Sequence, residues 1–227
     1  MSARSVTTAS SRPSGATGLS PRAFAGLKRL MGGIDRPDAC EICSTPLSAE
    51  HPHLLGQASG QVHCACTACA ILFDGAPGAT FRRIPRSARR ISPSLVSGDI
   101  WTDFHIPVRL AFLGIDGAGM PYAMYPSPAG PVRSHPDHSW AVLVQRHQIL
   151  QEVNAGVEAL LMNATAPPGE IYIAPIDRCY QLVGLVRVCW RDLSGGPQIP
   201  GEVGQFFAAL RESASGAEVT GPGAGVP

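Results

Sequence analysis

Five of the seven cysteines lie between residues 40 and 69, in a spacing typical of metal sites. They read Cys40-Glu-Ile-Cys43 and, after a gap of 20 residues, Cys64-Ala-Cys66-Thr-Ala-Cys69. Two cysteines separated by two residues can bind one ion, because the turn between them points both sulfur atoms the same way. Two such turns supply a closed tetrahedral shell for zinc. We therefore predict zinc bound by Cys40, Cys43, Cys66 and Cys69.

Other donors in the same segment leave alternatives open. Cys64 is surplus in this assignment, but the spacing also allows Cys64 to replace Cys66 or Cys69. Imidazole is a good ligand for zinc or iron, and the segment also contains His51, His53 and His63. Three interpretations of these histidines stay open. They are ordinary polar residues of a loop and a strand, or spare ligands of a single metal site, or ligands of a second metal site.

Iron is the alternative ion, because four thiolates on two turns also form the iron site of rubredoxin. Rubredoxin turns usually carry glycine and aromatic residues close to the iron. The turns here read Cys-Glu-Ile-Cys-Ser and Cys-Thr-Ala-Cys-Ala, without either residue type. This difference favours zinc over iron.

The remaining polar clusters indicate no specific reaction. Asp103-Phe104-His105 and His135-Pro136-Asp137-His138 could each pair a carboxylate with an imidazole for acid–base chemistry, but no nucleophile motif accompanies them. The glycine-rich stretch Gly114–Gly119 lies between two expected strands, which favours a hairpin turn over a phosphate-binding loop. We leave enzymatic activity open and favour a protein without one.

Composition limits the class of protein. The net charge is +1 and only 15% of residues are charged, which argues against a general nucleic-acid binder. Five arginines between residues 82 and 90 could contact phosphate, but a solvated basic linker explains them more simply. No stretch is long and apolar enough to span a membrane. Without an apolar export signal, we expect a cytoplasmic protein in which cysteines stay reduced.

The elements that must position the cysteines divide into several segments. We expect an α+β protein, because strands and helices do not alternate regularly. Residues 1–34 are expected to be a disordered tail containing a short amphipathic helix, residues 35–80 the zinc-ribbon-like module, and residues 81–97 an arginine-rich linker. Residues 98–212 are expected to form the α+β domain, and residues 213–227 a second tail.

Hydrophobic periodicity predicts the main elements. In the module we expect a hairpin of Leu54-Leu55 and Gln61–Cys64 that turns at Ser59-Gly60. In the larger domain the expected strands are 108–115, 122–125, 171–175 and 179–190, the last after a helical turn at 177–180; the segment 157–162 is a strand or a helix. The expected helices are 138–153 and 201–211, and the prolines at 126, 128 and 131 predict an irregular loop.

Three stretches resemble an uncharacterised actinobacterial family encoded beside high-affinity, oxygen-tolerant nickel–iron hydrogenases. They are the cysteine and histidine pattern of residues 40–73, the segment Tyr125-Pro-Ser-Pro-Ala-Gly130, and residues 174–185 with 190–196. The family has no established activity to carry over. The resemblance implies an accessory role in assembling, maturing or wiring a hydrogenase, and it includes His51 and His53.

The sequence therefore predicts a metal-binding accessory protein that docks on a hydrogenase subunit or a maturation factor. The arginines of residues 82–90 and the amphipathic helix near residues 24–31 are candidate contacts. Two other functions stay open. One is a rubredoxin-like iron electron carrier, and the other is a nucleic-acid-binding zinc ribbon.

Overall fold

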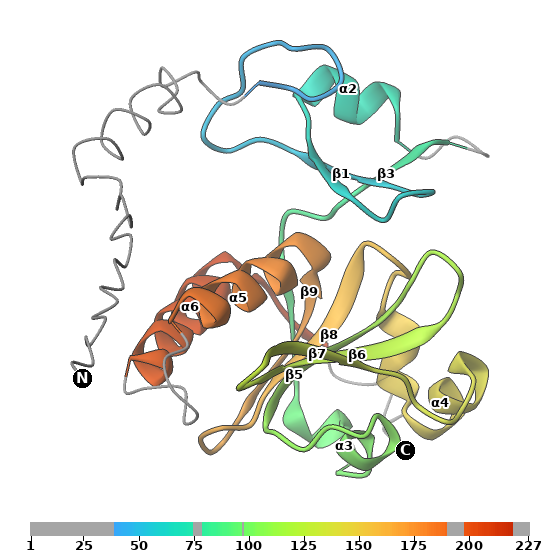
Figure 1. The fold of residues 1–227 in the computed structure, drawn as a ribbon, viewed down its shortest axis with the longest axis vertical. Helices are drawn as coiled ribbons and strands as arrows, with labels where there is room; N and C mark the ends of the chain where they lie inside the picture. Colours follow the sequence, from blue (N-terminus) through green and yellow to red (C-terminus); the bar gives the residue numbers. More distant parts are fainter. Residues whose placement is uncertain (1–38, 75–78, 97, 190–197, 220–227) are drawn as a thin grey trace, which may run out of the picture. The chain divides into compact units, whose positions relative to one another are not determined.

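Two β-sheets organise the part of the chain that the computed structural model describes, which is residues 39–74, 79–96, 98–189 and 198–219 (Figure 1). The smaller sheet has three strands in the order β2-β1-β3, and the larger has seven. The amphipathic helix expected near residues 24–31 lies outside the described residues. Helices and strands both contribute to the core, so the fold is α+β as predicted.

The small sheet contains the predicted hairpin. Strand β1 (His53–Gly56) pairs antiparallel with β2 (Val62–Cys64), and β3 (Phe81–Arg83) adds to the other side of β1. The chain reverses between β1 and β2 at Gly60, whose φ of +67° lies in the left-handed region that favours glycine. The hairpin and its turn are therefore confirmed.

The large sheet has the strand order β10-β4-β9-β8-β5-β6-β7. All neighbours pair antiparallel except β10 and β4, which are parallel. The strands are β4 (Arg89–Ile91), β5 (Leu110–Ile115), β6 (Pro121–Ser127), β7 (Gly130–Ser134), β8 (Glu158–Asn163), β9 (Glu170–Pro175) and β10 (Ser215–Val219).

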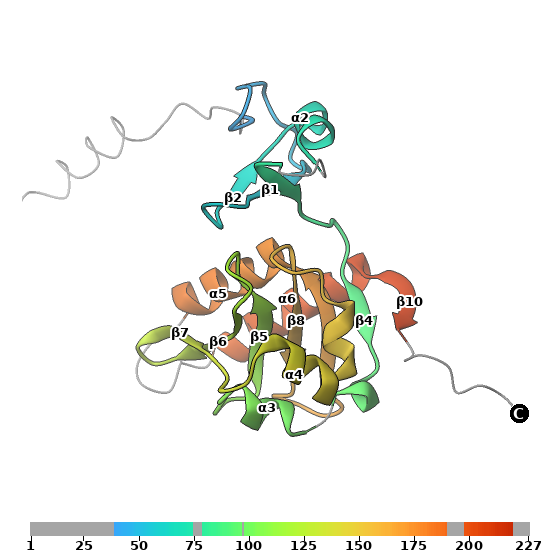
Figure 2. The ribbon, with the colours of Figure 1, turned by 90° about the vertical axis from the view of Figure 1, so that its right-hand side faces the viewer.

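Helices cover both faces of the large sheet (Figures 1 and 2). Helices α5 (Ile176–Cys189) and α6 (Ile199–Ser213) lie on one face, and α3 (Ile100–Asp103), α4 (Trp140–Arg146) and the 3-10 turn η2 (Gln148–Glu152) lie on the other. A second 3-10 turn, η1, spans Pro93–Leu95. Alternate side chains of a strand point to opposite faces of the sheet. Strands β5 and β8 are covered on both faces, and they are accordingly apolar along almost their whole length and contribute to two cores.

Helix α5 corrects our prediction of a strand at residues 179–190. Ile176, Cys179, Leu182 and Val186 are its buried residues, and they recur every three or four positions. That spacing places them on one face of a helix. The valines of this stretch favoured a strand by composition, but packing against the sheet and α6 determines the outcome.

The proline-rich segment also differs from our expectation of an irregular loop. Strand β6 continues to Ser127 and pairs with β7, so that Pro126 lies opposite Pro131. Proline cannot donate to a sheet, but β7 is an edge strand and β6 pairs with β5 only as far as Met124. The prolines therefore lie where the missing N–H groups cost little.

Three further segments differ from the predicted boundaries. Residues 81–97, expected to be a linker, contain β3 and β4, and the expected tail after residue 213 contains β10. The helix expected over residues 138–153 is interrupted at His147, which separates α4 from η2. The backbone of His147 is not helical, with φ of −126° and ψ of 83°, and its buried imidazole bonds Asp103 at 2.7 Å (Nε2 to Oδ2).

Candidate metal centre

The first cysteine pair lies in a tight turn before β1. The Cys40 carbonyl accepts a hydrogen bond from Ser44 N at 2.7 Å, and Cys40 N donates to the Thr45 carbonyl at 2.8 Å. Ser44 has a φ of +63°, a left-handed conformation that closes the turn in so few residues. Cys40 is buried beneath the turn while Cys43 is exposed at its outer end.

The second pair lies where the chain leaves β2 and enters α2 (Thr67–Leu72). Cys66 is the N-cap of this helix, and its sulfur accepts a hydrogen bond from Cys69 N at 3.4 Å. The start of α2 therefore directs a backbone N–H group at the Cys66 sulfur.

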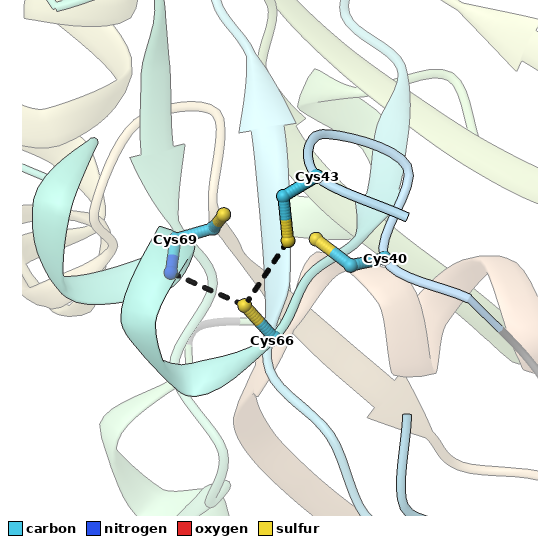
Figure 3. A group of neighbouring side chains, drawn as sticks. All are labelled: Cys40, Cys43, Cys66 and Cys69. Atoms are coloured by element: carbon cyan, nitrogen blue, oxygen red, sulfur yellow. Dashed lines mark hydrogen bonds between the residues drawn. The ribbon is translucent and has the colours of Figure 1, made fainter. Parts of the chain in front are cut away.

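The two turns bring the four sulfur atoms together (Figure 3). All four Sγ atoms, those of Cys40, Cys43, Cys66 and Cys69, lie within 4.8 Å of one another. Cys43 Sγ lies 3.7 Å from Cys66 Sγ. A zinc–sulfur bond of about 2.3 Å sets the edge of a tetrahedral centre at about 3.8 Å. The Cys43–Cys66 pair already has this separation, so the donor set fits zinc or iron with small shifts of the other sulfur atoms.

The environment of the four thiols differs within the group. Hydrogen bonds from the side chain and backbone of Thr45 lower the pKa of Cys43 to about 6, whereas burial raises the pKa of Cys69 to about 12. Burial also acts to raise the pKa of Cys40, but backbone N–H groups, first that of Cys66, outweigh it and lower that pKa. Four adjacent thiolates repel one another, so a cation is needed for all four to ionise together.

Cys64 lies outside this sulfur group. It is on β2, directly opposite His53 on β1, and it belongs with His51 and His53 to a second group whose donor atoms lie within 4.8 Å of one another. His63, on the other face of β2, bonds Glu41 at 2.7 Å (Nδ1 to Oε2). That hydrogen bond lowers the pKa of Glu41.

Sequence reasoning missed the partner of His53. His53 Nδ1 lies 2.6 Å from Asp177 Oδ2. Asp177 is at the start of α5, 124 residues after His53 in the sequence. No local pattern marks this aspartate as a neighbour of the cysteine module. Only the tertiary fold, in which Leu55 of the module and Ile84 after β3 pack into the same core as α5, brings the two together.

The other polar clusters rearrange in the structure. Asp103 bonds His147 and Arg146 rather than His105, and His105 lies 3.2 Å from the exposed Asp137. His135 Nδ1 lies 3.0 Å from the Pro121 carbonyl. These pairs join secondary-structure elements, and they do not converge with a nucleophile on a single site among the residues that the structure describes.

Three arginines of the basic segment make internal contacts, and one of them, Arg86, lies 3.8 Å from Glu50. Arg82 donates to the Ala155 carbonyl at 2.5 Å, and Arg89 donates to the Glu152 carbonyl at 2.6 Å. Arg89 also pairs with Glu152 and with the buried Glu158. The contacts of Arg82 and Arg89 attach β3 and β4 to the segment from η2 to the start of β8, which reduces the basic surface available to a phosphate backbone.

The longest helix of the described residues, α6, has 15 residues, and none in this part of the chain combines the length and apolarity needed to cross a membrane. No curated protein and no solved structure matches the sequence. Residues 39–214, which contain both sheets up to the start of β10, match one protein family, described as a family of unknown function, DUF5947. The chain therefore belongs to this uncharacterised family.

Proposed function

We propose that this protein is a non-enzymatic accessory protein in which Cys40, Cys43, Cys66 and Cys69 hold one structural zinc ion. The observation that carries the proposal is the convergence of the four sulfur atoms from two turns. Four protein ligands close the coordination shell, which is the pattern of structural rather than catalytic zinc. The ion would connect the chain before β1 to the chain after β2.

The small core of the module supports a structural role for the ion. Among the residues that the structure describes, the cluster around the cysteines contains five buried ones: Cys40, Leu54, Ala65, Cys69 and Ala70. So small a core contributes little burial, and a structural zinc contributes on the order of 10 kcal/mol or more to the folding of a comparable module. The metal is therefore expected to be the main stabilising element of this end of the molecule.

The partner that we propose is a hydrogenase subunit or a hydrogenase maturation factor. The sequence resemblance to the hydrogenase-associated family supports this choice. A candidate contact surface is the end of α2, where Ile71 and Leu72 are 66% and 74% exposed and Phe73 is 38% exposed. Adjacent exposed apolar residues of this size are typical of protein interaction sites.

Purification from the native host tests both parts of the proposal. Elemental analysis is expected to give at least one zinc per chain, and affinity capture is expected to recover a hydrogenase subunit or maturation factor. A red protein containing iron would instead indicate the rubredoxin-like electron carrier. Salt-sensitive binding to DNA or RNA would indicate the nucleic-acid-binding ribbon.

A matched pair of variants tests the contact surface. Ile71→Ser with Leu72→Ser is expected to abolish recovery of the partner, because it removes the apolar area of α2. Val188→Ser on α5 is the control, since Val188 is 80% exposed and distant in the sequence. Equal recovery by both variants would exclude α2 as the contact.

A further inference from the structure

A second set of metal-ligand side chains lies beside the four-cysteine centre. His51, His53 and Cys64 each offer one donor atom, and the three atoms lie within 4.8 Å of one another. His51 is in the loop before β1, while His53 and Cys64 are opposite each other in the β1–β2 pair. Opposed residues of neighbouring strands project from the same face of a sheet, so the pairing itself brings imidazole and thiol together.

Both histidines are held in the orientation that metal-binding histidines usually have. His51 Nδ1 lies 2.9 Å from the Ser48 carbonyl, and His53 Nδ1 lies 2.6 Å from the Asp177 carboxylate. Each contact favours the tautomer with the proton on Nδ1, which leaves the Nε2 lone pair to bind an ion. Carbonyl and carboxylate acceptors of this kind orient histidine ligands and increase their basicity.

His51 supplies an independent indication of a ligand. Its Nε2 is buried and has no hydrogen-bond partner among the described residues. A buried polar atom without a partner is costly, and a bound ion would satisfy it. The two imidazole rings meet edge to face with centroids 5.0 Å apart, so they are direct neighbours.

A pocket lies beside the two histidines. It has a volume of about 340 Å³ and borders His51, His53 and Asp177, with Arg86 and Arg178 also in its lining, whereas Cys64 does not line it. Three protein ligands leave one position of a tetrahedral ion free for water or a small ligand. This arrangement differs from the four-cysteine centre, where protein ligands fill the whole shell.

We propose that His51, His53 and Cys64 bind a second transition-metal ion, with Asp177 as the positioning residue for His53. Two imidazoles and one thiolate suit zinc, and the free fourth position makes this ion more exchangeable than the first. Tetrahedral zinc with these donors requires separations of about 3.4 to 3.6 Å, so binding would draw the three donor atoms together by up to about 1.4 Å. The proposal goes beyond the structural zinc centre and does not depend on the identity of the protein partner.

Native mass spectrometry of the full chain, reconstituted with zinc alone, tests the proposal. The wild type is expected to bind two ions, and Cys64→Ser and His51→Gln are each expected to bind one. His63→Gln is the matched control, because His63 precedes Cys64 but projects from the other face of β2 towards Glu41. It is expected to keep two ions. Asp177→Asn is expected to keep both ions but to bind the second about 10- to 100-fold more weakly.

The outcomes separate this site from the structural one. A wild type with a single ion that Cys43→Ser removes would overturn the second site and leave the structural centre intact. Loss of all zinc from Cys64→Ser would assign Cys64 to the four-cysteine centre and also overturn the proposal. Two ions retained in both Cys64→Ser and His51→Gln would overturn it as well. No ion in the wild type would contradict both the proposed function and this inference.

Discussion

Replacing Cys43 with serine tests the zinc centre most directly, because Cys43 is exposed and contributes little to packing. Its sulfur lies 3.3 Å from Thr45 Oγ1 and 3.7 Å from Cys66 Sγ. In metal-free protein, Cys43→Ser should therefore change the free energy of unfolding by no more than about 0.5 kcal/mol, as for other surface substitutions. In zinc-loaded protein the same change removes one of four ligands.

The magnitude in zinc-loaded protein follows from the energy of the whole centre. Structural zinc contributes about 10 to 16 kcal/mol to the folding of small zinc modules, so one ligand of four accounts for about 3 kcal/mol. Zinc affinity should then fall about 100-fold. The difference between the zinc-loaded and metal-free effects of Cys43→Ser, about 3 kcal/mol, is the quantity that the structure predicts.

Zinc competition with a chelator and urea denaturation with and without zinc measure these two quantities. Hydrogen exchange locates the effect, since amide protection should fall in β1 and β2 and persist in β5 and β8. Cys189→Ser on α5 is the control, because Cys189 belongs to neither donor group and should show equal small effects with and without zinc. A Cys43→Ser effect that is the same with and without zinc would refute the assigned centre.

Three further predictions concern the large sheet. Phe207→Ala should reduce the free energy of unfolding by about 3 to 5 kcal/mol in urea denaturation, because Phe207 is buried against Tyr172; a loss under 1 kcal/mol would contradict this packing. Asp103→Ala should cost about 1 to 3 kcal/mol in thermal denaturation, because it leaves the buried His147 imidazole without its acceptor, and an unchanged melting temperature would contradict it. Partial burial acts to raise the pKa of Asp116, but two backbone N–H groups and an arginine outweigh it and lower that pKa. As the pH falls through the ordinary aspartate range, the unfolded chain then binds more protons than the folded protein, which destabilises the fold. The wild type should therefore lose more stability between about pH 5 and pH 3 than Asp116→Asn does. Equal acid sensitivity of the two proteins would contradict this.

The part of the site that the sequence could predict is the part that local geometry determines. A Cys-x-x-Cys turn directs two sulfur atoms together over four residues, so the grouping of Cys40 with Cys43 and of Cys66 with Cys69 follows from spacing. The contact between His53 and Asp177 depends instead on how α5 packs against the module, and no local spacing records that. The sequence could name the two histidines as candidate ligands but not the carboxylate that orients one of them.

The same distinction explains which elements were predicted. The β5–β6 hairpin and helix α6 follow clear alternating or helical patterns, and both are present near the expected boundaries. Helix α5 was mistaken for a strand because its valines have high strand propensity, although its buried residues recur at helical spacing. Strand β10 pairs with β4 more than 120 residues earlier, so its formation depends on a long-range partner rather than on its own sequence.

The buried junction after β3 determines how this protein can be dissected. Ile84 is 1% exposed and shares a core with Leu55 of β1 and with residues of β5 and β8. A fragment that ended at residue 83 would expose Leu55 to water, and each such side chain left unburied costs about 1.5 to 3 kcal/mol. The cysteine segment expressed alone would therefore be prone to aggregation, and metal measurements on such a peptide would describe a different molecule from the intact chain.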